Sequence, residues 1–225
     1  SLYDILSYGR NVDGKIYYSG NYRATTTPYI IQELRRLAKT SKSKRVTIIA
    51  HSNGGLVAKA LVNKLGSEAL PLIDKIIFVA VPQVGTPQAI GALLHGYEQG
   101  LPKDWLTVFL TLETARTLAK NMPSAYNLLP SANYFTQVDN PAVTFDNSDI
   151  LAEFRTRYGA TIHSGDRLRD FITDTWRLAS SSPSNLIYPS VGNATLFSRA
   201  ETLHTALDTW TPPQGVALYE VAGWG

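Results

Sequence analysis

Ser52 is the residue whose surroundings most clearly suggest chemistry. The segment before it, residues 46–50 (VTIIA), is short, wholly apolar and rich in β-branched side chains, as a buried strand should be. After it, apolar residues recur at helical spacing, at Leu56, Val57, Ala60, Leu61 and Leu65. A serine at a sharp strand-to-helix turn holds its hydroxyl exposed above the sheet, as in the G-x-S-x-G nucleophile elbow. The pattern therefore predicts that Ser52 is a nucleophile.

The residues next to Ser52 favour this interpretation. Ala50 stands where the elbow pattern has its first glycine, and a methyl group is still small enough for strand and helix to pass closely. The backbone N–H of Asn53, at the positive end of the following helix, is expected to donate to an oxyanion. The alternative is that Ser52 only caps the helix, as serines commonly do. A cap requires neither small residues at Ala50 and Gly54 nor a histidine before the serine.

Length and composition limit the class of protein. The chain has 225 residues, 44% hydrophobic and 17% charged, enough for one domain with an insertion. No apolar run approaches the ~20 residues that span a bilayer, so no transmembrane segment is expected. No signal peptide is expected either, because Ser1 leads directly into domain-like sequence. The location is left open between the cytoplasm and secretion from a bacterium, with secretion favoured.

Charge and residue counts argue against several kinds of partner. The net charge is +3, and the densest basic run, residues 39–45 (KTSKSKR), is typical of a solvated loop, so no nucleic-acid partner is expected. The absence of cysteine excludes disulfides, thiolate chemistry and cysteine metal sites. No His/Asp/Glu group has metal-ligand spacing and no glycine-rich phosphate loop is present. The sequence predicts neither a metal nor a cofactor.

The first third of the chain alternates strand and helix patterns. Strands are expected at residues 15–18 and 75–81 as well as before Ser52, and an amphipathic helix at residues 29–39. A further helix is expected to end within residues 1–8. Alternation of this kind implies a parallel sheet with right-handed crossovers.

Residues 86–213 break this alternation, because they contain helical patterns and no convincing strand. Helices are expected at residues 105–122, 149–158, 166–178 and 194–210. Such an insertion resembles a lid over a pocket, although ordinary core-packing layers would give the same periodicity. Strand character returns at residues 216–221.

Four stretches carry a resemblance to a known family. Residues 50–61 (AHSNGGLVAKAL) resemble the elbow of serine lipases in the α/β-hydrolase superfamily. Residues 79–87 (VAVPQVGTP), 122–130 (MPSAYNLLP) and 212–225 (PPQGVALYEVAGWG) are similar to the post-elbow loop, lid segment and late strand of the lecithin:cholesterol acyltransferase-like lipases. The four occur in the family's order and are distributed over most of the chain, from residue 50 to residue 225.

The resemblance implies an α/β fold: an incomplete parallel-sheet α/β-hydrolase core with a helical lid insertion. Residues 1–85 and 211–225 would form the core portion and residues 86–210 the lid. It also implies a serine esterase or lipase that acts on acyl esters, with lipids as the expected substrates, through an acyl-enzyme on Ser52. Water or another alcohol would then release the acyl group, so an acyltransferase is an alternative. A non-catalytic lipid- or partner-binding domain is the second alternative.

The family pattern also places parts of the machinery beyond this sequence. The catalytic acid and base would follow Gly225, and the strand with the second oxyanion donor would precede Ser1. The chain is therefore expected to be an interior piece, nearly inactive alone. Its partners would be an acyl-ester or lipid substrate and the remaining N- and C-terminal parts of the hydrolase, supplied as a separate chain.

None of the four histidines is predicted to be the base. His51 is interpreted as structural, His95 as a loop or lid residue, and His163 as part of a polar turn with no strand before it. His204 has Asp208 four residues later on the same helical face, a spacing that could orient an imidazole. Pairs at this spacing are usually solvated, and the order reverses that of the superfamily.

Overall fold

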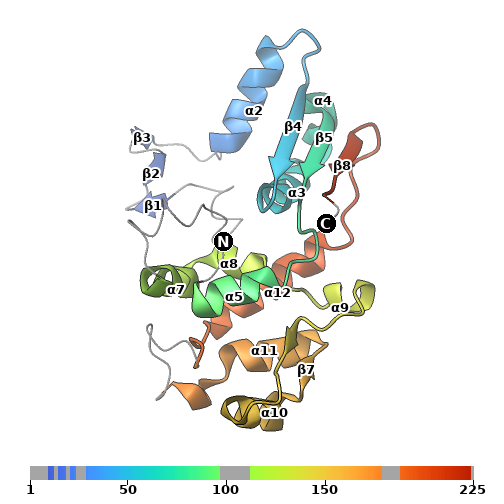
Figure 1. The fold of residues 1–225 in the computed structure, drawn as a ribbon. Helices are drawn as coiled ribbons and strands as arrows, with labels where there is room; N and C mark the ends of the chain where they lie inside the picture. The colour runs from blue at the N-terminus through green and yellow to red at the C-terminus, as the bar shows by residue number, and fades with distance from the viewer. Residues whose placement is uncertain are drawn as a thin grey trace. The chain divides into compact units, whose positions relative to one another are not determined.

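The chain is described here from a computed structural model, in which two compact units are distinguished (Figure 1). Unit 1 comprises Ser1–Gln83 and Thr209–Gly225, and unit 2 comprises Val84–Asp208. The structure describes residues 10–12, 15–18, 21–23, 29–96, 112–178 and 188–223. The helix expected within residues 1–8 lies outside this set.

Unit 1 contains a three-stranded parallel sheet in the order β4-β5-β8. Its strands are β4 (Val46–His51), β5 (Ile73–Val79) and β8 (Ala217–Val221). Both pairings are parallel, and β8 comes from the far end of the sequence to pair with β5. The apolar runs predicted these strands because a parallel strand is buried on at least one face along its whole length. The predicted α/β core with a parallel sheet is confirmed.

In the described part of unit 1 one helix precedes β4, and three helical elements lie between β4 and β5. The helical elements are α2 (Tyr29–Thr40), α3 (Gly54–Leu65), the 3-10 turn η1 (Gly66–Glu68) and the short α4 (Ala69–Leu72). In α3 the apolar stripe predicted from the sequence is buried, with Leu56 and Ala60 completely inaccessible. The β4-α3-β5 connection thus fixes the turn that carries Ser52.

The strand predicted at residues 15–18 does not join the parallel sheet, so that part of the prediction is wrong. It is β2 (Lys15–Tyr18), which pairs antiparallel with β1 (Arg10–Val12) and with β3 (Asn21–Arg23). Only a few residues separate these strands, and a connection that short can join only antiparallel neighbours. A parallel partner would require a crossover of a dozen or more residues.

Unit 2 is mainly helical, as predicted. Its described elements include α5 (Gln88–His95), α7 (Leu112–Asn121), α8 (Pro123–Asn127), α9 (Tyr134–Gln137), η2 (Asp149–Leu151), α10 (Ala152–Tyr158), α11 (Gly165–Thr173), η3 (Thr175–Arg177) and α12 (Ala194–Leu207). The first part of the helix expected from residue 105 lies outside the described residues. No described helix has both the length and the apolar content to cross a membrane.

The prediction that residues 86–213 lack strands is wrong. The strand β6 (Val143–Thr144) pairs antiparallel with β7 (Thr161–Ile162), and α10 lies between them in the sequence. Two-residue strands are too short to show an alternating pattern, so no periodicity could reveal them. Around this pair, aromatic rings fill the core of unit 2, and Phe154 lies 5.8 Å from Phe145 between ring centroids.

Candidate active site

Ser52 occupies the turn between β4 and α3 with a backbone φ of 52°. Left-handed backbone of this kind is uncommon outside glycine and costs about 1–3 kcal/mol, so the surrounding structure must enforce it. The sharp strand-to-helix turn that the sequence predicts at Ser52 is confirmed. The side chain is partly exposed, and its hydroxyl makes no hydrogen bond to any residue that the structure describes.

The ends of all three parallel strands hold this turn in place. The Ser52 N–H donates to the Val79 carbonyl at 3.1 Å, and the Ala80 N–H donates to the Val221 carbonyl at 2.9 Å. Ser52 therefore lies outside the carboxyl ends of parallel strands, where ligands bind in open α/β sheets. Ala80 is a second strained residue here, with φ 47°. Sequence analysis missed it because an alanine gives no signal of left-handed backbone.

The close passage of helix and strand depends on Gly55 rather than on Gly54. A Cβ at Gly54 would lie 3.9 Å from the Ala50 Cβ, an ordinary contact. A Cβ at Gly55 would lie 2.3 Å from a methyl group of Val81, which no real structure tolerates. The elbow motif predicts the crowding at Ala50 and Gly54, and this prediction is wrong because the contact of Gly55 with Val81 arises only in the folded unit.

Asn53 is the N-cap of α3, and its side chain makes no capping hydrogen bond. The helix-cap alternative for Ser52 therefore fails, since Ser52 lies one residue earlier and its hydroxyl bonds to no N–H of the described helix. No backbone acceptor for the Asn53 N–H is found among the described residues. At the positive end of α3 this N–H is suited to stabilise an oxyanion. The Asn53 Oδ1 is buried without a partner in the described part of the chain.

Two of the histidines lie at strand ends. His51 is the last residue of β4 and is exposed, next to Ser52 in the sequence. His163 is also exposed and directly follows β7, so the expectation of no strand before it is wrong. His95 ends α5 and is half-buried. Burial, followed by the charges of Arg116 and Arg177, lowers the pKa of His95 below its ordinary value of 6.5.

The expectation that the His204–Asp208 pair is solvated is wrong. The side chains are 5% and 8% exposed, and His204 Nδ1 lies 2.7 Å from Asp208 Oδ1. Asp208 Oδ2 accepts a hydrogen bond from Ser131 Oγ at 2.6 Å, so the pair belongs to a buried network of unit 2. Burial was invisible in the sequence because the partner lies far away along the chain.

The hydrogen bond of the other ring nitrogen, Nε2, determines whether His204 can act as a base. His204 Nε2 lies 2.8 Å from the Asn127 carbonyl oxygen. A carbonyl oxygen cannot donate, so Nε2 carries the proton and donates it. This nitrogen is therefore not free to accept a proton from a serine, and the geometry gives His204 a structural role within unit 2.

No metal-binding group of three or more His, Cys, Asp or Glu side chains is present among the described residues. On β8 the carboxylate of Glu220 accepts a hydrogen bond from the Gln83 side chain. The described part of unit 1 thus supplies a strained serine followed by a backbone N–H with no acceptor among the described residues. The role of Ser52 and Asn53 in catalysis stays a prediction.

Comparison with known proteins gives one family match. The sequence matches the lecithin:cholesterol acyltransferase family over residues 30–197, well over half of the chain. The search of curated proteins finds no match. Among solved structures the fold is similar to one described as "The crystal structure of Tle4-Tli4 complex", at 16% identity and a TM-score of 0.49. That likeness covers 84% of this chain and 39% of the other, so the chain spans less than half the length of the protein it matches.

Proposed function

Because the chain belongs to the lecithin:cholesterol acyltransferase family, we propose that it carries the nucleophile of an enzyme that acts on lipid acyl esters. The observation that carries the proposal is the backbone of Ser52, held at φ 52° at the carboxyl end of β4. Residues with backbone strain of this size cluster at active sites, and the nucleophile elbow is one such case. Unit 2, inserted between β5 and β8, is proposed to act as a lid.

The chemistry proceeds in two steps. Ser52 Oγ loses its proton to a base and attacks the ester carbonyl carbon, while the Asn53 N–H donates to the developing oxyanion. The tetrahedral intermediate collapses, the alcohol leaves with a proton returned by the base, and the acyl group stays on Ser52. Attack by water releases a fatty acid, and attack by another alcohol transfers the acyl group.

The base and its acid are proposed to come from polypeptide outside this chain. His204 cannot serve as the base because its Nε2 donates to the Asn127 carbonyl. Removal of triad members from serine hydrolases lowers kcat by several orders of magnitude, so the isolated chain is expected to be nearly inactive. The remaining N- and C-terminal parts of the hydrolase domain would complete the site.

The test uses the longer polypeptide that includes this chain, assayed on fatty-acyl esters of graded chain length. Ser52→Ala should lower kcat by at least about 10³-fold with the fold intact. The matched control is Ser43→Ala, an exposed serine whose hydroxyl donates to the Arg45 carbonyl, which should leave the rate unchanged. Unchanged hydrolysis by Ser52→Ala would overturn the assignment.

A second candidate, acyl transfer to an alcohol, is favoured by the name of the family, which describes an acyltransferase. The same assay separates the two activities when a long-chain alcohol is added as acceptor. Formation of a new ester at the expense of free fatty acid identifies a transferase, and unchanged fatty-acid release identifies a hydrolase. Both products should disappear in Ser52→Ala.

A further inference from the structure

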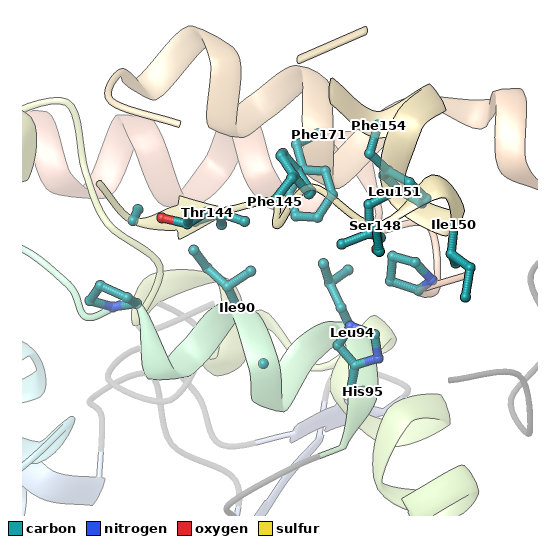
Figure 2. A pocket seen from close by; sticks show the side chains of 15 residues that line it. Ile90, Leu94, His95, Thr144, Phe145, Ser148, Ile150, Leu151, Phe154 and Phe171 are labelled. Carbon is teal, nitrogen blue, oxygen red and sulfur yellow. The ribbon is translucent and has the colours of Figure 1, made fainter. Parts of the chain in front are cut away.

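Unit 2 contains a pocket of about 500 Å³ that none of the chemistry above uses (Figure 2). Volumes of this order are typical of small-molecule sites. One wall is a face of α5, formed by Pro87, Ile90, Gly91, Leu94 and His95. Because these residues recur at helical spacing, the pocket runs along the whole helix, over roughly 12 Å.

The opposite wall is mainly apolar and largely aromatic, with Thr144 and Ser148 as its polar residues. Phe145, Phe154 and Phe171 line it together with Leu151, and Figure 2 shows these side chains facing Ile90 and Leu94 across the gap. Ile150 also lines the pocket while 58% exposed, so the pocket opens to solvent there. A long apolar groove of this kind accepts a single hydrocarbon chain, since burial of each methylene contributes about 0.8 kcal/mol.

One end of the pocket differs from the rest in charge. Among the described residues that line it, His95 is the one ionisable residue, and none is Asp or Glu. The segment that includes Pro189, another lining residue, lies against this end, because the Ser190 N–H donates to the Leu94 carbonyl at 3.3 Å.

Two buried guanidinium groups converge on that segment. Arg177 is fully buried and donates to the carbonyls of Pro189 at 3.1 Å and Phe171 at 2.6 Å, both lining residues. Arg116, 1% exposed, donates to Ser190 Oγ at 3.0 Å. Arg177 Nη1 is buried and has no partner among the described residues.

Both guanidinium groups act on His95, which lines the pocket. Arg116 and Arg177 are the charged groups that act on His95, where both lower its pKa after the larger effect of burial. Asp174 acts on Arg177 but not on His95. Among the described residues, the charges that act at the His95 end are therefore positive, and in a site of low polarity positive charge favours an anion.

We propose that this pocket binds a single-chain amphiphile with an anionic head group. The hydrocarbon chain lies along α5 against the phenylalanine wall, and the carboxylate of a fatty acid or the phosphate of a lipid sits at the His95 end. Every residue used here lies in unit 2, so the binding does not depend on whether Ser52 is a nucleophile.

The test measures binding by calorimetry to the chain carrying Ser52→Ala, with ligands kept below their critical micelle concentrations. Dodecanoate and dodecyl phosphate distinguish the two head groups, while dodecanol and dodecyltrimethylammonium supply neutral and cationic heads on the same tail. One or both anions should bind with one-to-one stoichiometry, at least about tenfold more tightly than dodecanol. Equal or tighter binding of the alcohol or the cation would overturn the proposal.

Gly91 provides a matched pair of variants, because a Cβ placed there meets no atom within 4 Å. Gly91→Ala adds one methyl group and should leave the affinity unchanged. Gly91→Leu fills the pocket and should weaken dodecanoate at least about tenfold, while replacement of glycine inside a helix keeps the fold stable. Thermal melting of both variants verifies folding. Unaltered affinity in folded Gly91→Leu would place the ligand elsewhere and contradict the proposal, as would no binding by the parent chain.

Discussion

His95 connects the electropositive end of the pocket to the pH dependence of stability. Its pKa in the folded chain is lowered from 6.5 by burial, and further by Arg116 and Arg177. As pH falls through 6.5, the unfolded chain takes up a proton more readily than the folded chain does, so stability is lost on acidification. His95→Gln should therefore reduce the loss of stability below pH 6.5. Above neutral pH the substitution should not change how stability depends on pH.

The measurement is the urea midpoint of the parent and of His95→Gln at a series of pH values between 5 and 8, an interval chosen to be roughly centred on the histidine pKa. His163→Gln serves as the control, because His163 is exposed. Identical pH slopes for the parent and His95→Gln would show that His95 is not desolvated in the folded state.

Single residues differ in how far the sequence reveals them. Ser52 could be found because a motif surrounds it and because an apolar strand and a helical pattern flank it. Ala80 could not, since its left-handed backbone follows from the hydrogen bond of its N–H to Val221, far along the chain. His204 was recognised with its partner Asp208, but its burial depends on contacts with Asn127 and Ser131 that no local pattern records.

The packing of α3 against the segment after β5 predicts a sharp difference between adjacent glycines. Gly55→Ala would place a methyl group 2.3 Å from Val81, a stiff β-branched side chain, and should destabilise unit 1 by about 1–3 kcal/mol. Gly54→Ala, with only an ordinary contact at 3.9 Å, should be neutral or stabilising by up to about 1 kcal/mol. Urea unfolding of the two variants gives the comparison.

A double variant shows whether Val81 is the cause. Gly55→Ala combined with Val81→Ala should recover most of the lost stability, because the clashing methyl groups are removed. If the double variant loses as much stability as the two single variants lose together, the close contact described for Gly55 is wrong.

The buried pair His204–Asp208 predicts that the charge and the shape of the Asp208 side chain contribute differently to stability. Asp208→Ala leaves His204 Nδ1 and the Ser131 hydroxyl without their shared acceptor, and should cost about 3–5 kcal/mol. Asp208→Asn should cost less, because the amide can donate to Nδ1 of a neutral imidazole and accept from Ser131. Thermal or urea unfolding decides between them, and equal costs would contradict the buried network.

Helices and strands were predictable to different degrees. The helices α2, α3 and α12 each carry an apolar stripe long enough to recognise, and β4 and β5 are apolar throughout. The pair β6 and β7 spans two residues per strand, too few for a period to emerge. The hairpins of β1, β2 and β3 look locally like any strand, and only connection length reveals their antiparallel pairing.

The parallel sheet leaves one apolar face open in this chain. Ile49 is 70% exposed and Tyr219 55%, and both pair with Ile77 across the sheet, so they lie in one row on one face. Parallel sheets are almost always covered on both faces. This supports the proposal that further polypeptide of the hydrolase domain packs here.

Cysteine accessibility tests that proposal cleanly because the sequence has no cysteine. Ile49→Cys should react rapidly with a thiol reagent in the 225-residue chain, and at least about tenfold more slowly when the flanking polypeptide is present. Glu153→Cys, at an exposed position of α10, is the control and should react equally in both. Unchanged reactivity of Ile49→Cys would mean that the added polypeptide does not cover this face.

Labelling of the longer polypeptide with a fluorophosphonate tests the nucleophile assignment most directly, because the reagent phosphonylates an activated serine. Peptide mass spectrometry should locate a single adduct on Ser52, and Ser52→Ala should abolish labelling while Ser43→Ala retains it. An adduct on another serine, or no adduct on Ser52 in a polypeptide that hydrolyses esters, would contradict the account.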